Sequence, residues 1–225
     1  MNEYYKIEGQ TLADVADKVR TYTGATNQIK GKDLDIGVDN VYEAGKQAEY
    51  DALWDAIQRK GARPHYAYAF SYNGWDDKIF NPKYPITPLN TSGILWMCQW
   101  NQLITDMKVP IAAYGSAQGA FYECKNLKRI PKIIFDGTTN LSNTFYNCIG
   151  LEEMYCEGVI EINGFDVHWS TLLSHDSLMS IINVLQDKTS DTSGTSWVCT
   201  LGTANLAKLT DAEKAIATQK GWSLA

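Results

Sequence analysis

The chain contains two closely similar stretches, AFYECKNLKRI (120–130) and TFYNCIGLEEM (144–154), whose matching positions lie 24 residues apart. Each carries Phe-x-x-Cys-x-x-Leu followed three residues later by Ile or Met, with Tyr directly after the Phe. Self-similarity at a fixed period predicts a repeat architecture, because one unit cannot bury its apolar side chains alone and must stack on the next copy. The pair therefore predicts stacked 24-residue turns.

Extending the period of 24 outward predicts the core. Like residues recur in three columns, and the outermost copies are degraded, as expected for units that end a stack. The expected core columns are Met97, Phe121, Phe145 and Trp169, then Trp100, Cys124, Cys148 and Leu172, then Leu103, Leu127 and Leu151.

Cys124 and Cys148 fall in neighbouring turns, so a disulfide or a metal pair is one interpretation. Two buried thiols that act as small apolar residues are the favoured interpretation. The chain has five cysteines and three histidines, and no Cys-x-x-Cys pair. We therefore expect no metal site and no cofactor.

The repeated pattern resembles the BspA-like leucine-rich repeats, over roughly residues 75–185. The resemblance implies a short strand and a turn or helical segment per repeat, stacked into a solenoid, and it implies no reaction. The expected fold class is α+β, a short leucine-rich-repeat solenoid with an N-terminal helical module and a C-terminal capping strand and helix.

The two ends follow a different pattern from the repeats. Apolar residues recur at helical spacing after Thr11, and a second helix is expected over about 41–59. At the other end, we expect a helix over 174–187, a strand over 197–201, and a last helix opened by a capping box at Thr210–Glu213. The predicted segments are a helical assembly module (1–61), an aromatic cap (62–96), the repeats (97–187) and a C-terminal cap (188–225).

The stretches TLADVADKVR (11–20) and AGKQAEYDALWD (44–55) resemble a module of tail and fibre proteins from phages and prophages of Gram-positive bacteria. The resemblance implies a virion component. Its N-terminal helices would assemble with other virion proteins or with a second copy of the chain.

Two groups of aromatic residues are candidate binding residues. If Phe121 and Phe145 point inward from strands, then Tyr122 and Tyr146 point outward as a ladder suited to sugar or protein recognition. The segment 61–90 is rich in aromatics and alternates like a strand, which allows two interpretations. It is either a platform for sugar rings or a cap of the core, and the cap is favoured because aromatics commonly fill cores. The candidate residues in this segment are Tyr66, Tyr68 and Trp75.

The chain shows no catalytic pattern. It has no Gly-x-Ser-x-Gly elbow, no phosphate-binding glycine loop and no His-Glu-x-x-His helix. The Asp76–Asp77 and Glu152–Glu153 pairs are typical of solvated surface, and Ser174–His175–Asp176 is typical of a helix start rather than a triad. We therefore predict no catalytic residues and no enzyme.

The net charge of −6 argues against nucleic-acid binding, which requires a positive surface. The first residues lack a secretory signal, and no apolar run is long enough to enter a membrane. The leading hypothesis is a non-enzymatic tail- or fibre-associated virion protein, made in the host cytoplasm, that binds a host-surface glycan or protein or another virion component. The alternatives are a BspA-like surface adhesin, which requires export, and a cell-wall-active enzyme.

Overall fold

The computed structural model describes residues 69–72, 75–77, 80, 82, 85–87 and 92–225. The predicted assembly module (1–61) lies outside the described residues, as do the candidate binding residues Tyr66 and Tyr68. The described chain combines short parallel strands with helices near the C-terminus.

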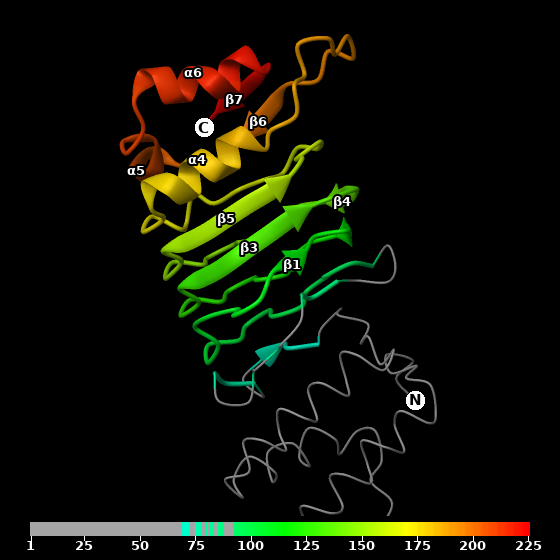
Figure 1. The fold of residues 1–225 in the computed structure, drawn as a ribbon, viewed down its shortest axis with the longest axis vertical. Helices are drawn as coiled ribbons and strands as arrows, with labels where there is room; N and C mark the ends of the chain where they lie inside the picture. The colour runs from blue at the N-terminus through cyan, green and yellow to red at the C-terminus, as the bar shows by residue number, and fades with distance from the viewer. Residues whose placement is uncertain (1–68, 73–74, 78–79, 81, 83–84, 88–91) are drawn as a thin grey trace, which may run out of the picture.

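Successive strands lie side by side in parallel (Figure 1). One sheet has the order β1-β3-β5, formed by β1 (Ile111–Ala112), β3 (Arg129–Phe135) and β5 (Glu153–Gly158). A second pairs β2 (Gly115–Ser116) with β4 (Thr138–Asn140). In the first sheet Arg129 pairs with Glu153 and Ile130 with Met154, so neighbouring strands there are one 24-residue period apart.

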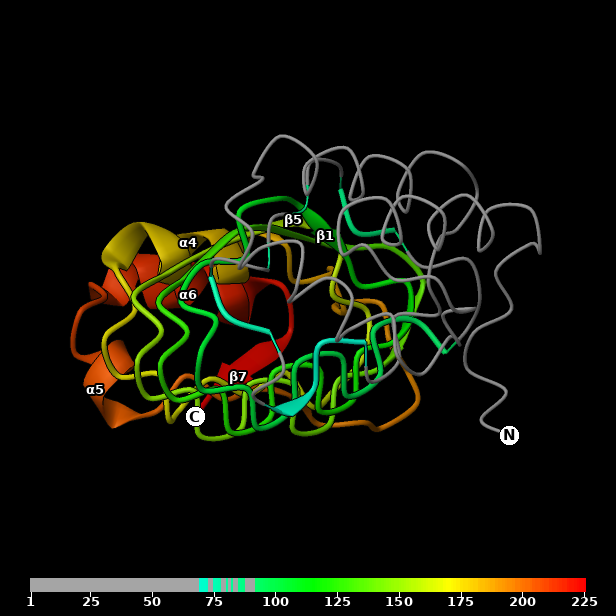
Figure 2. The ribbon, with the colours of Figure 1, turned by 90° about the horizontal axis from the view of Figure 1, so that it is seen from below.

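The chain between the strands is also bonded from one turn to the next. The backbone N–H of Cys98 donates to Ala120 at 2.7 Å, and that of Phe121 donates to Thr144 at 2.9 Å. These segments are hydrogen-bonded turns rather than strands. Figure 2 shows β1 and β5 along one side of the stack and the turn-forming segments along the opposite side.

Side chains from both sides fill the space between them. Phe121 and Phe145 are fully buried and stack with ring centroids 5.6 Å apart and planes 6° from parallel. The thiol of Cys124 donates to the carbonyl of Cys98 at 2.8 Å, and that of Cys148 donates to Phe121 at 2.9 Å. Seven of the expected core residues are buried, namely Met97, Phe121, Cys124, Leu127, Phe145, Cys148 and Leu151.

The expected columns are wrong at the outer turns, where equivalent positions slip by one residue. A backbone hydrogen bond across three residues marks the same position in each turn, and it is accepted by the carbonyls of Cys98, Phe121, Phe145 and Ser170. These residues are spaced by 23, 24 and 25 positions along the chain. The first column therefore ends in Ser170 rather than Trp169.

The slip moves four expected core residues to the surface. Trp169 and Leu103 are 39% and 42% exposed, and the adjacent Ser170 and Ile104 are buried instead. A residue gained or lost in a turn shifts which side chain faces inward, and a strict period cannot register that change. The second column is corrected in the same way: Trp100 and Leu172 are exposed, and Asn101 and Leu173 are buried in their places.

Buried asparagines stand at both ends of this stack. The Asn101 amide donates to the carbonyls of Phe70 and Trp75, both at 3.0 Å, while its oxygen accepts two backbone N–H groups. At the opposite end, the Asn205 amide donates to the carbonyls of Ser170 and Leu201 at 3.2 and 2.9 Å. Both amides therefore satisfy carbonyls that would otherwise be buried without partners.

Helix α4 (His175–Asn183) lies along β5, where another strand would continue the sheet (Figure 1). The Ser177 and Ser180 hydroxyls accept the backbone N–H groups of Met154 and Cys156 at 2.9 and 3.1 Å. The edge of β5 is thereby covered, which prevents pairing with another chain.

The remaining elements close the same end of the stack. They are β6 (Trp197–Cys199), α5 (Thr203–Leu206), α6 (Asp211–Gln219) and β7 (Trp222–Leu224), with β6 parallel to β7. The predicted capping box of Thr210 and Glu213 is confirmed at the start of α6, and Ser174 caps α4 as expected.

Candidate binding surface

Tyr122 and Tyr146 lie on consecutive turns and stack on each other, with ring centroids 4.8 Å apart and planes 11° from parallel. Both side chains are half-buried. The residues belong to hydrogen-bonded turns and not to the strands that we expected, but each still points away from the buried Phe that precedes it.

The tyrosine pair is the centre of a longer row of rings. Trp100 and Trp96 contact Tyr122 at centroid distances of 5.9 and 5.5 Å, and Tyr72 contacts Trp100 at 5.2 Å. On the other side, Trp169 contacts Tyr146 at 5.6 Å. We call the following six residues the aromatic row: Tyr72, Trp96, Trp100, Tyr122, Tyr146 and Trp169.

The rings of the row differ in orientation. The tyrosine faces cover each other, whereas Trp100 lies at 86° to Tyr122 and Trp169 lies at 63° to Tyr146. Trp100 is 42% exposed, and Tyr72 is 59% exposed. The row therefore presents indole surface at steep angles on both sides of a compact tyrosine pair.

Three rings of the row stand on backbone that aromatic residues rarely adopt. Tyr72, Trp96 and Trp100 have φ angles of 61°, 51° and 56°. In the next two turns, the position of Trp96 is taken by Gly119 and Asn143, which tolerate this conformation far better. The left-handed conformation costs an ordinary residue about 1–2 kcal/mol, so the surrounding structure must hold these aromatics in place.

Gly119 explains how Trp96 is accommodated. A Cβ atom at Gly119 would overlap the indole of Trp96, so this ring lies directly on the glycine backbone. Gly119 itself has a φ of +59°. The turn that carries Tyr122 thus supplies the bare backbone on which the Trp96 ring from the preceding turn lies.

The charged groups beside the row are paired with one another. Lys125 contacts the Glu123 carboxylate at 2.9 Å, and the Asn147 amide donates to the same carboxylate oxygen at 3.0 Å. These contacts, that of Lys125 above all, lower the pKa of Glu123. Near Trp169, the His168 ring nitrogen lies 2.6 Å from an Asp166 oxygen.

Most of the row was not among the candidate binding residues. Trp100 and Trp169 were assigned to core columns because a strict period of 24 was applied, and the register slip exposes both. Trp75 is instead packed against the core, with its ring 5.2 Å from that of Phe70. The predicted platform at Trp75 is therefore wrong, and the alternative interpretation as a cap fits its position.

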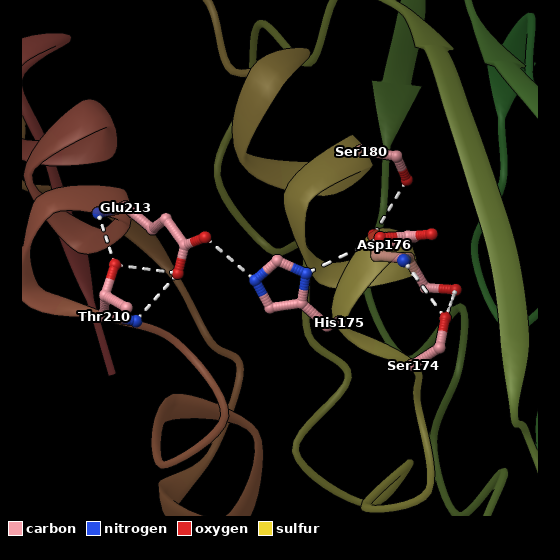
Figure 3. Close-up of polar contacts among 7 residues, drawn as sticks. Ser174, His175, Asp176, Ser180, Thr210 and Glu213 are labelled. Atoms are coloured by element: carbon pink, nitrogen blue, oxygen red, sulfur yellow. Dashed lines mark hydrogen bonds and ion pairs between the residues drawn. The ribbon is translucent and has the colours of Figure 1, made fainter.

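The Ser174–His175–Asp176 sequence does not form a triad (Figure 3). His175 places Nε2 2.9 Å from Glu213 and Nδ1 3.5 Å from Asp176, so both ring nitrogens face carboxylates. Its pKa is raised, mainly by the hydrogen bond with Glu213. The Ser174 hydroxyl accepts the Ser177 N–H as a helix cap. His175 therefore links the start of α4 to the start of α6.

The cysteines are buried and free. Burial raises the pKa of Cys124 and of Cys156 to about 12, and it also raises the pKa values of Cys98, Cys148 and Cys199. A thiol reacts as its thiolate, so these cysteines are unsuited to nucleophilic chemistry.

Within the described ranges, no three His, Cys, Asp or Glu side chains gather as a metal site would require. No helix in the part of the chain that the structure describes is long and apolar enough to cross a membrane. Comparisons with protein-family models, curated proteins and solved structures gave no match.

Proposed function

We propose that this chain is a non-enzymatic, tail- or fibre-associated virion protein of a phage or prophage. A leucine-rich-repeat scaffold of the BspA-like type would bind the host surface or another virion component. The observation that carries the binding role is the aromatic row, a continuous array of rings displayed by successive turns.

Two features support the repeat scaffold. Neighbouring strands pair in parallel one period apart, as between Arg129 and Glu153. Like side chains also stack on like side chains, as with Phe121 on Phe145. Stability in such a scaffold arises between neighbouring turns, so residues on its surface are free to vary for recognition.

The use of the polar groups supports binding over catalysis. His175 joins two helices, and Ser174 caps one of them. The chemically reactive groups in the described ranges thus have structural partners, while the exposed part of the aromatic row has no such role. Large aromatic side chains with polar tips are common in recognition surfaces, because they give wide contact at a low entropic cost.

The virion assignment rests on the resemblance of residues 11–20 and 44–55 to phage and prophage tail proteins. The test is co-sedimentation of the purified full chain with intact Gram-positive host cells and, separately, with tail particles that lack it. Binding to one of these that is lost in a Trp169→Ala variant supports the proposal. Tyr114→Ala is the matched control, because Tyr114 is also 42% exposed and lies outside the row. Binding to neither target refutes the proposed function.

A further inference from the structure

We infer that the aromatic row binds an extended, neutral, β-linked glycan chain. The inference rests on the proposed binding function and names the class of its ligand. It follows from the shape of the row, the charges beside it and the backbone that holds it.

The row has the form of a linear site. Its central contacts, from Trp100 through Tyr122 and Tyr146 to Trp169, have centroid distances of 5.9, 4.8 and 5.6 Å. These distances limit the separation of the two indoles to about 16 Å. No single ring dominates, and each turn contributes one step. Such a surface suits a polymer of repeated units better than a compact small molecule.

The chemistry of the rings fits sugars. A β-linked pyranose carries its hydroxyl groups around the edge and leaves C–H groups on its two faces. Those faces pack on indole and phenol rings, while the hydroxyls require hydrogen-bonding partners near the ring edges. Trp100 and Trp169 provide exposed ring surface, and Tyr122 and Tyr146 provide phenol groups between them.

The charges favour a neutral ligand. Glu123 is paired with Lys125, and His168 with Asp166, so each charge beside the row already has a partner of opposite sign. A polyanion would have to compete with Glu123 for Lys125. A neutral chain leaves both pairs intact and still finds polar atoms at the border of the row.

The backbone shows that the row is held in place before any ligand binds. Trp96 and Trp100 retain left-handed φ angles despite their size, and Trp96 is seated on Gly119. Backbone strain of this kind concentrates at functional sites. A surface that is already ordered loses less conformational entropy when it binds.

The experiment titrates the full chain with cellohexaose and with chitohexaose, and follows tryptophan fluorescence and heat. Trp100→Asn and Trp169→Ala are the test variants. Asparagine suits position 100 because Asn147 holds the equivalent left-handed position two turns later. Tyr114→Ala is the control. We expect saturable binding of at least one hexasaccharide, with about a tenfold weaker Kd in each test variant, equal to about 1.4 kcal/mol, and no change in the control.

The outcomes separate this inference from the proposed function. If neither hexasaccharide binds, or if the test variants bind as tightly as the parent chain, the inference is overturned. If the test variants lose attachment to cells or tails while the hexasaccharides do not compete, the proposed function stands and the glycan class is wrong. Self-association that disappears in Trp100→Asn, without sugar binding, would assign the row to contact between copies of the chain and also overturn the inference.

Discussion

Replacing Gly119 with alanine tests how the aromatic row is built. Gly119 has a φ of +59°, and the added Cβ would overlap the Trp96 indole. The left-handed conformation costs alanine about 1–2 kcal/mol. Displacing Trp96 also breaks its edge contact with Tyr122, and such aromatic pairs contribute about 0.5–1.5 kcal/mol. We expect Gly119→Ala to lower the free energy of unfolding by about 2–3 kcal/mol.

The assay is urea unfolding, followed by fluorescence and by near-ultraviolet circular dichroism, with the free energy taken from linear extrapolation. Gly194→Ala is the matched control, because Gly194 has a φ of +77° and no atom within 4 Å of the added Cβ. This control isolates the backbone cost, so we expect it to lose about 1 kcal/mol less than Gly119→Ala.

A second control removes the overlap. In a Trp96→Gly background, Gly119→Ala should cost only what Gly194→Ala costs, because no indole remains above the new Cβ. Equal losses for Gly119→Ala and Gly194→Ala, or the same loss with and without Trp96, would show that the indole does not depend on the bare backbone of Gly119.

Three further changes test the core and the C-terminal cap. Phe145→Ala should destabilise the chain by about 3–5 kcal/mol, measured by urea unfolding, because it leaves a cavity between stacked turns; a loss below about 1 kcal/mol would contradict that packing. Asn101→Ala should cost about 2–4 kcal/mol, since buried carbonyls and N–H groups lose their partners; Gln99→Ala, another buried amide, is its control, and equal losses would count against the network. The raised pKa of His175 means that its contribution is complete below its unfolded pKa of about 6.5 and is lost as pH rises through the folded pKa. The lowered pKa of Glu213 means that its contribution is lost as pH falls below the usual carboxyl range. The Tm difference between the parent chain and His175→Gln should therefore be larger near about pH 5.5 than near about pH 8.5, and an equal difference at both would refute the link.

The local pattern was sufficient to predict several parts of the described structure. The two matching stretches at 120–130 and 144–154 placed Phe121 on Phe145, because identical spacing repeats the same inward positions. Helix starts at Ser174 and Thr210 were also predictable, since capping depends on side chains within three residues of the cap. Each of these features is local or strictly periodic, and such features are visible in a single sequence.

The outer register and the aromatic row depended on the folded chain. Adjacent turns interact only with their neighbours, so one residue added or lost in a turn is tolerated, and it exchanges Trp169 for Ser170 in the core. The row needs rings from separate turns to meet, and Trp96 reaches its place only because its own φ is positive and Gly119 leaves space above the backbone. The repeat was therefore encoded in side-chain spacing, whereas the surface that we propose for binding arises from backbone conformation and from contacts between turns.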